Sequence, residues 1–156
     1  MLKNTTRKRK PKKKSCITIV ASVYNAEYVD GMIAGALETL ASSGIENVEL
    51  IRVPGAFEIP VVAARLTQRK LKRPEVVLCL GVILRGKTKH ADHIGHSVSQ
   101  SLAQIATTSG IPMIHEVLLL ENKAQAKARC LSVKTNRGTE AAHTALAMAA
   151  LMQQLH

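Results

Sequence analysis

One segment, Gly81 to His90, holds most of the residue types that could bind an anion and move a proton. It follows an apolar run, Val76 to Leu80, which predicts a buried strand, and it precedes a helical pattern. Gly86–Thr88 would then offer backbone N–H groups, a lysine cation and a hydroxyl at a helix N-terminus, where anions bind. His90 stands beside this turn, and an imidazole is suited to proton transfer at cellular pH. The segment therefore predicts an anion site with a proton-transfer group.

The same segment fits the GxxxxGK[ST] pattern of P-loop nucleotide-binding proteins letter for letter. Its four variable positions are Val, Ile, Leu and Arg, which are typical of a continuing strand and not of a loop around phosphates. No later strand ends in the Asp that helps to hold Mg²⁺, and Glu116 lies inside an apolar run. A P-loop NTPase stays an alternative, to be tested by ATP binding that depends on Mg²⁺ and on Lys87.

Three histidines, His90, His93 and His96, recur at three-residue spacing and raise the hypothesis of a metal site. Such a row drifts around a helix, and no Cys or second cluster stands at ligand spacing. We interpret His93 and His96 as surface residues and expect no metal.

Two further segments follow predicted strands. Pro54 to Glu58 forms a turn into a helix, where small residues let a ligand approach the backbone. Glu58 could accept hydrogen bonds from ligand hydroxyls, or only complement the helix dipole. Tyr24 follows the first predicted strand. Two of the only three aromatic residues in the chain, Tyr24 and Phe57, therefore lie in segments that follow predicted strands. Ligands of parallel α/β sheets bind at the carboxyl ends of the strands, so we expect these segments to meet there.

Strand and helix patterns alternate along the chain. Strands are predicted over 17–21, 48–53, 76–80 and 112–120, and helices over 27–43, from about 58, and over 92–109, 122–131 and 138–154. This order predicts an α/β fold, in which a parallel sheet carries helices on both faces. The near absence of aromatic residues predicts an aliphatic core.

The basic charge is concentrated in the first fourteen residues. Residues 1–14 contain eight Lys or Arg and no acid, whereas the remaining 142 residues carry 14 basic and 11 acidic residues. We predict a disordered tail, 1–14, and one domain, 15–156. The tail has three interpretations: a solvated arm, an arm that touches RNA or another polyanion, and a targeting signal. The basic stretch 69–73 is interpreted as a surface connection.

Membrane insertion and secretion are not expected. The longest apolar run, Val76 to Leu84, has nine residues, and a spanning helix needs about 20. Cys16, Cys79 and Cys130 stand alone in apolar or helical surroundings, so we interpret them as reduced core thiols of a cytoplasmic protein.

Five segments, in order and in register, resemble the lumazine synthase family: VASVYN (20–25), RVPGAFEIP (52–60), GVILRGKTKHADHI (81–94), QAKAR (125–129) and NRGTEAAHTALAMA (136–149). The resemblance covers roughly residues 16–154. It implies a flavodoxin-like three-layer sandwich with a four-stranded parallel sheet, and a homopentamer with active sites between neighbouring subunits. Some members assemble twelve pentamers into an icosahedral shell.

The resemblance also implies the reaction. A cofactor-free transferase of riboflavin biosynthesis condenses 5-amino-6-ribitylaminouracil with 3,4-dihydroxy-2-butanone 4-phosphate. The products are 6,7-dimethyl-8-ribityllumazine, phosphate and water, and no metal or organic cofactor takes part.

Carried over residue by residue, the resemblance gives each candidate site residue a role. The pyrimidine ring would stack on Tyr24 and lie beside His115. Its ribityl chain would contact Ala56, Phe57 and Glu58. The edge of the ring would meet the backbone of Val82, Ile83 and Leu84. The phosphate would be held by Lys87 and Thr88 on one side and by Arg129 of the neighbouring subunit on the other. His90 would be the catalytic residue, which shuttles protons during imine formation and phosphate loss.

Several positions depart from the family pattern. His115 stands where Phe is common, Glu116 where Gly is, and Leu119 where Thr is. Tyr24 replaces Phe or Trp, Ala91 replaces an aromatic residue, and Val133 and Arg137 stand where Lys is frequent. The changes at 115–119 touch the pyrimidine side of the site, and the phosphate side is intact. A catalytically weakened shell or scaffold paralogue, with a polyanion-binding tail, is therefore the alternative function.

Overall fold

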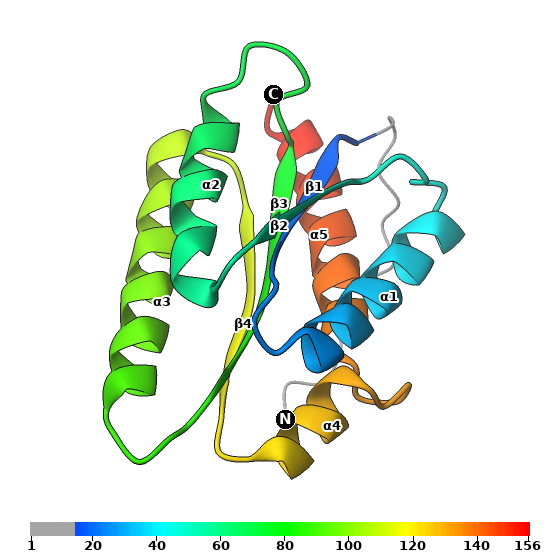
Figure 1. Cartoon of the computed structure of the whole chain (residues 1–156). Coiled ribbons are helices and arrows are strands. Elements are labelled where there is room, and N and C mark those ends of the chain that lie inside the picture. Colours follow the sequence, from blue (N-terminus) through cyan, green and yellow to red (C-terminus); the bar gives the residue numbers. More distant parts are fainter. Residues whose placement is uncertain (1–14) are drawn as a thin grey trace.

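A computed structural model describes residues 15–156 as three layers, with a parallel sheet between two layers of helices (Figure 1). The strands are β1 (Ile17–Ser22), β2 (Glu49–Val53), β3 (Val76–Leu84) and β4 (Met113–Leu120), in the order β2-β1-β3-β4. All three neighbouring pairs are parallel. The predicted flavodoxin-like α/β fold is confirmed. The predicted tail, 1–14, lies outside the described residues.

Helices cover both faces of the sheet. On one face lie α1 (Ala26–Ser42), α4 (Lys123–Cys130) and α5 (Arg137–Gln154), and on the other lie α2 (Ile59–Thr67) and α3 (His90–Ser109), as Figure 1 shows. A short 3₁₀ turn, η1 (Ala56–Glu58), precedes α2. Asn122 and Asn136 accept hydrogen bonds from backbone N–H groups in the first turns of α4 and α5, which fixes where these helices begin.

The core is aliphatic, as predicted. Two clusters of buried side chains lie on the two faces of the sheet, and β3 is buried over eight of its nine residues. Tyr28 is buried on the α1 side, whereas the two other aromatic residues are exposed. The backbones of α1 and α5 approach so closely that a Cβ atom on Gly138 would lie 1.9 Å from the carbonyl oxygen of Met32. Only glycine fits at this crossing.

Some boundaries differ from those predicted. Strand β3 runs to Leu84 and not to Leu80, because residues 81–84 pair with 117–120 of β4. Helix α3 begins at His90, two residues earlier than predicted, and α2 begins at Ile59 because η1 takes up the preceding turn. Among the predicted core thiols, Cys79 and Cys130 are buried but Cys16, at the start of β1, is only half-buried. Within residues 15–156, no helix has the length and hydropathy needed to cross a membrane.

Candidate active site

The candidate site lies where the order of the strands reverses. From β1 the chain moves to β2 on one side and then to β3 on the other, so the carboxyl ends of β1 and β3 mark the switch point at which a binding crevice is expected. The pairing of β1 with β3 ends at Ala21 and Leu80, whereas β3 continues to Leu84. The last four residues of β3 therefore have β4 on one side and no strand on the side of β1.

Hydrogen bonds join the three predicted segments at this edge. The N–H groups of Val23 and Tyr24, after β1, donate to the carbonyl oxygens of Val53 (2.7 Å) and Pro54 (3.0 Å), after β2. Asn25 Nδ2 donates to the Val82 carbonyl oxygen at 2.8 Å. The structure thus brings together segments that lie 30 to 57 positions apart in the sequence.

Asn25 is the residue that sequence reasoning undervalued. It precedes the first residue of α1 and takes a left-handed conformation, with φ 59°. Asn tolerates this conformation better than most residues and is favoured before a helix, which was the available signal. Its side-chain amide turns to β3, so Asn25 fixes the turn that carries Tyr24.

Two aromatic rings are exposed at this edge. Tyr24 is 73% exposed and Phe57 is 59% exposed, whereas Tyr28, four residues after Tyr24, is 4% exposed. The exposed faces of Tyr24 and Phe57 are not needed to fill the core. They are available to stack on or pack against a ligand.

Glu58 has a structural role beside its predicted one. Its Oε2 atom accepts a hydrogen bond from the Gly55 N–H at 2.9 Å, which closes the turn after β2. A carboxylate can accept several further hydrogen bonds, so Glu58 can still receive the hydroxyls of a ligand. Within this turn, Ala56 is buried and Phe57 is exposed.

The backbone groups of β3 face alternate sides of the strand. The N–H groups of Val77 and Arg85 donate toward β4, to Pro112 (3.0 Å) and Leu120 (2.8 Å). By alternation, the backbone groups of Ile83 also face β4, whereas those of Val82 and Leu84 face the crevice. Of the three backbone positions predicted to contact the pyrimidine, the structure thus presents two to the crevice.

The predicted anion turn lies at the N-terminus of α3. Gly86, Lys87 and Thr88 are exposed, and Thr88 Oγ1 accepts a hydrogen bond from the His90 N–H at 3.4 Å. Arg85 anchors the start of the turn, with Nη1 2.7 Å from Asp92 and Nε 2.9 Å from Glu121. These hydrogen bonds raise the pKa of the Arg85 guanidinium. Residues 81–84 belong to β3, so the P-loop alternative is not supported: a strand does not wrap around phosphates.

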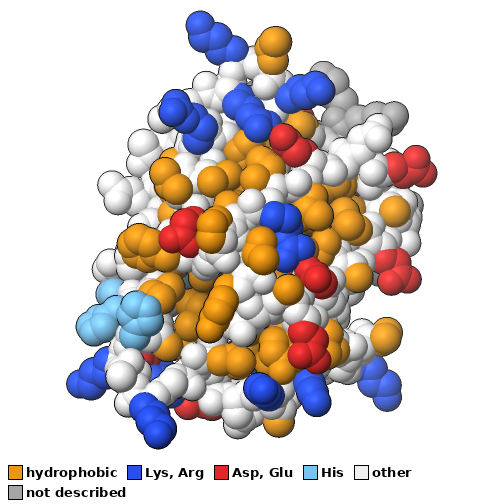
Figure 2. Space-filling model, viewed as in Figure 1, with side chains coloured by type: hydrophobic (Ala, Val, Ile, Leu, Met, Phe, Trp, Pro, Cys, Tyr) orange, Lys and Arg blue, Asp and Glu red, His pale blue; other side chains and the backbone are white. Residues whose placement is uncertain are grey.

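His90 is exposed at the first residue of α3, beside the anion turn. His93 and His96 are also exposed, and Figure 2 shows histidines gathered on the surface at the end of the molecule where α3 begins. Among the side chains of residues 15–156, no group of three His, Cys, Asp or Glu is arranged to hold a metal ion.

His115 lies on the α3 side of β4. Its Nδ1 atom accepts a hydrogen bond from the Val117 N–H at 3.2 Å, so the neutral ring carries its proton on Nε2 and donates it to Ser99 Oγ at 2.7 Å. Partial burial lowers the pKa of His115, which favours this neutral form. The predicted substrate contact of His115 would therefore be made by a ring that is fixed in orientation.

Arg129 is exposed on α4, which packs against α1, α5 and β4. Helix α4 therefore lies on the opposite face of the sheet from α3 and the anion turn (Figure 1). Within one chain, Arg129 is thus carried by a helix on the other face of the sheet from the helix that follows Lys87 and Thr88. This placement agrees with the expectation that Arg129 serves the site of a neighbouring subunit.

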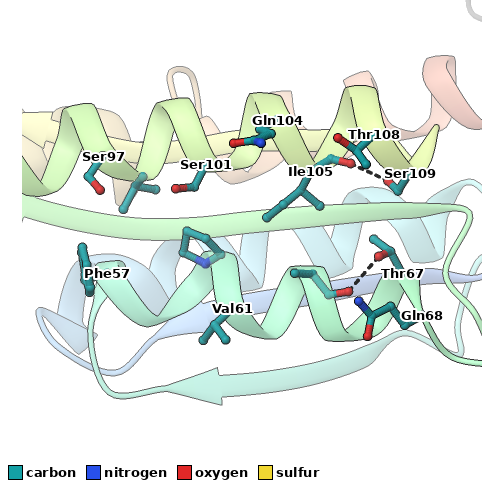
Figure 3. Close-up of a pocket in the computed structure, with 13 residues that line it drawn as sticks. Phe57, Val61, Thr67, Gln68, Ser97, Ser101, Gln104, Ile105, Thr108 and Ser109 are labelled. Carbon is teal, nitrogen blue, oxygen red and sulfur yellow. Dashed lines mark hydrogen bonds between the residues drawn. The ribbon is translucent and has the colours of Figure 1, made fainter.

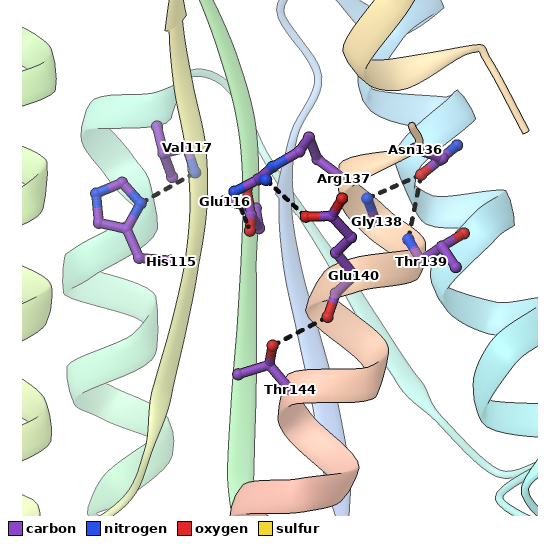
Figure 4. A network of polar contacts seen from close by, with 9 residues as sticks. All are labelled: His115, Glu116, Val117, Asn136, Arg137, Gly138, Thr139, Glu140 and Thr144. Atoms are coloured by element: carbon purple, nitrogen blue, oxygen red, sulfur yellow. Dashed lines mark hydrogen bonds and ion pairs between the residues drawn. The ribbon is translucent and has the colours of Figure 1, made fainter. Parts of the chain in front are cut away.

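Two departures from the family pattern, Glu116 and Arg137, meet in the structure (Figure 4). Arg137 Nε and Nη2 donate to the two carboxylate oxygens of Glu116, each at 3.0 Å, and Nη1 donates to Glu140 at 2.6 Å. Burial raises the pKa of Glu116, and the charges of Arg137 and Arg129 oppose this shift. Nothing in the residue types at 116 and 137 revealed this pairing.

A separate cleft of about 540 Å³ runs between α2 and α3. Its walls are formed by Phe57, Pro60 and Val61 on one side and by Ser101 and Ile105 on the other (Figure 3). Of the predicted site residues, only Phe57 borders it. The cleft is therefore distinct from the crevice at the strand ends.

Known proteins are similar in sequence to this chain over most of its length. A family model described as 6,7-dimethyl-8-ribityllumazine synthase matches residues 14–153. A protein of that name from Kineococcus radiotolerans is 41% identical over 132 residues, which are 83% of this chain and 80% of the relative. Those from Thermococcus onnurineus (37% identical; 89% of this chain, 90% of the relative) and Stenotrophomonas maltophilia (39%; 88% of each) match over 139 residues.

Proposed function

Because the chain belongs to the 6,7-dimethyl-8-ribityllumazine synthase family, we propose that it condenses 5-amino-6-ribitylaminouracil with 3,4-dihydroxy-2-butanone 4-phosphate. The observation that carries the proposal is the convergence of the segments after β1 and β2 on the end of β3, beside the anion turn. The sequence similarity to proteins named 6,7-dimethyl-8-ribityllumazine synthase extends over most of the chain, so the alternative of a catalytically weakened scaffold paralogue is not favoured.

In the proposed mechanism the chain orients two reactive substrates. The pyrimidine stacks on Tyr24, its ribityl chain reaches Phe57 and Glu58, and its polar edge meets the backbone of Val82 and Leu84. The amine attacks the ketone to form an imine, and loss of phosphate and ring closure follow. Holding both substrates in reactive geometry supplies much of the acceleration, because a bimolecular step becomes effectively unimolecular.

The anion turn binds the departing phosphate. Lys87 supplies a positive charge, and Thr88 a hydroxyl, at the positive end of the α3 dipole. His90, two residues after Thr88, can take a proton from the attacking amine and return it to a leaving oxygen.

The test is product formation in the presence of a chelator. Purified full-length protein is mixed with both substrates, and the lumazine product is followed by absorbance and fluorescence. We expect formation above the spontaneous rate. A folded protein that does not accelerate product formation would contradict the proposal and would favour the scaffold alternative instead.

Replacing Arg129 by alanine should raise the KM for the sugar phosphate at least tenfold, equivalent to about 1.4 kcal/mol of lost binding. A planar guanidinium binds phosphate through two parallel hydrogen bonds, which alanine cannot replace. Lys127→Ala, which also removes an exposed cation from α4, is the matched control and should leave this KM unchanged. An unchanged KM in Arg129→Ala would remove Arg129 from the site.

We also propose a homopentamer with sites shared between neighbouring subunits. In its support, α4 with Arg129 lies on the opposite face of the sheet from the anion turn. Light scattering distinguishes a pentamer, a decamer and a sixty-subunit shell. Co-expression of the His90→Ala and Arg129→Ala chains should restore part of the activity, since some sites then receive His90 from one subunit and Arg129 from the next. No restoration would show that each site is formed by one chain.

For the basic segment 1–14 we propose contact with RNA phosphates. In support, Ser15 and Cys16 lie beside the basic stretch 69–73: the Glu75 N–H donates to the Cys16 carbonyl oxygen at 2.8 Å, and Cys16 Sγ lies 4.0 Å from the Lys72 carbonyl oxygen. Figure 2 shows Lys and Arg side chains at this end of the molecule, and others at the opposite end near the histidines. We propose a cytoplasmic location, where Cys16, Cys79 and Cys130, which form no disulfide, stay reduced.

Removal of residues 1–14 should leave turnover unchanged and weaken the retention of RNA. Binding of the full chain should fall steeply as the salt concentration rises, because bound phosphates release counterions. Filter binding of labelled single-stranded RNA at two salt concentrations measures both effects. Unchanged retention by the shortened chain would refute the role of the tail.

A further inference from the structure

The guanidinium of Arg137 donates three hydrogen bonds to carboxylates and still has unused N–H groups. A guanidinium carries five N–H groups, and Arg137 gives two to Glu116 and one to Glu140. Among residues 15–156, no hydrogen bond uses the two that remain, one on Nη1 and one on Nη2. The Arg137 side chain is 31% exposed, whereas that of Glu116 is 11% exposed. Arg137 therefore keeps two unused donors on a side chain that is partly exposed.

Stability alone does not account for this pair. Glu116 lies in β4 among aliphatic side chains, where burial disfavours the charged form of its carboxyl group. Replacing such a pair by apolar residues is often neutral or stabilising, because desolvation offsets most of the attraction. A buried carboxylate that orients a partly exposed guanidinium is better explained by what the guanidinium can bind.

The pair lies on the face of the sheet that also carries α4 with Arg129. Burial raises the pKa of Glu116, and the positive charge of Arg129, the predicted phosphate residue, opposes part of this rise. Arg137 begins α5, seven residues after the end of α4. Glu116 and Arg137 both depart from the family pattern, and the structure shows them in direct contact, so they are expected to act together.

We propose that Glu116 is a positioning residue: its carboxylate, with that of Glu140, holds Arg137 so that its unused N–H groups donate to a ring carbonyl of the ribityl-pyrimidine. This inference rests on the proposed function. The uracil ring of that substrate carries carbonyl acceptors in its plane, and a planar guanidinium can donate to them in that plane. Glu116 itself does not touch the substrate.

The test compares Glu116→Gln, Arg137→Lys and the double variant in the full chain. Glu116→Gln keeps the shape of the side chain and removes its charge, so the fold is preserved while the guanidinium loses its orientation. We expect each single variant to raise the KM for the ribityl-pyrimidine about tenfold, with the KM for the sugar phosphate unchanged. The double variant should be no worse than the more impaired single variant, since Glu116 acts only through Arg137.

Glu49→Gln is the matched control. It breaks the ion pair of Glu49 with Arg69 (2.7 Å) at the first residue of β2, away from the carboxyl ends of the strands, and should change neither KM. Calorimetric titration of the ribityl-pyrimidine alone measures the same effect as a change in Kd, even if turnover is absent. An unchanged affinity in Glu116→Gln would overturn the inference, as would additive effects, or a rise confined to the KM for the sugar phosphate. Loss of product formation in the unmodified chain would count against the proposed function instead.

Discussion

Replacing His90 by alanine is expected to slow the condensation by about 10² to 10⁴-fold without abolishing it. His90 is exposed at the first residue of α3, next to the turn that holds Lys87 and Thr88. Its N–H, and not its ring, makes the hydrogen bond to Thr88, so alanine keeps the backbone geometry of the turn. The loss therefore reports proton transfer, and positioning of the two substrates accounts for the rate that remains.

The measurement is kcat at saturating concentrations of both substrates, after subtraction of the spontaneous reaction. His93→Ala is the matched control, because His93 is exposed one turn further along the same helix. It should retain the turnover of the unmodified chain. A His90→Ala variant as fast as the unmodified chain would refute the catalytic role of His90. A variant with normal kcat and a raised KM would make His90 a binding residue only.

Replacing Gly138 by alanine is expected to lower the free energy of unfolding by about 2–3 kcal/mol. In an ordinary helix this substitution stabilises by roughly 1 kcal/mol. Here the new Cβ atom would lie 1.9 Å from the Met32 carbonyl oxygen and within 2.6 Å of two further backbone atoms of Met32. Backbone atoms cannot rotate away, so α1 and α5 would have to move apart and expose part of the core between them.

Denaturant unfolding at one fixed protein concentration gives the comparison, because assembly makes apparent stability depend on concentration. Gly95→Ala, inside α3, is the control: the nearest atom to its Cβ would be Leu119 Cδ2, in ordinary contact at 3.6 Å. This variant should be as stable as the unmodified chain or slightly more so. An unfolding midpoint of Gly138→Ala equal to that of Gly95→Ala would contradict the close approach of α1 and α5.

The sequence alone determined the layers and the edge at which to look for the site. Patterns along a strand or helix are local: the run Val76 to Leu80 predicts a strand that is buried on both faces, and apolar positions in α1 recur with the helical period. Because the predicted strands are parallel, all their carboxyl ends lie at one edge of the sheet. Tyr24, Glu58 and the anion turn could therefore be assigned to one site before any contact was known.

Only the tertiary structure decided which residues meet across that framework. The hydrogen bond of Asn25 to Val82 spans 57 positions, and the pair of Glu116 with Arg137 spans 21. Both depend on the order β2-β1-β3-β4 and on the packing of α5 against the sheet. The hydrogen bond of the His115 ring with Ser99 likewise needs a residue from a neighbouring element. Such contacts connect separate elements, and periodicity within an element carries no information about the side chains that another element will bring beside it.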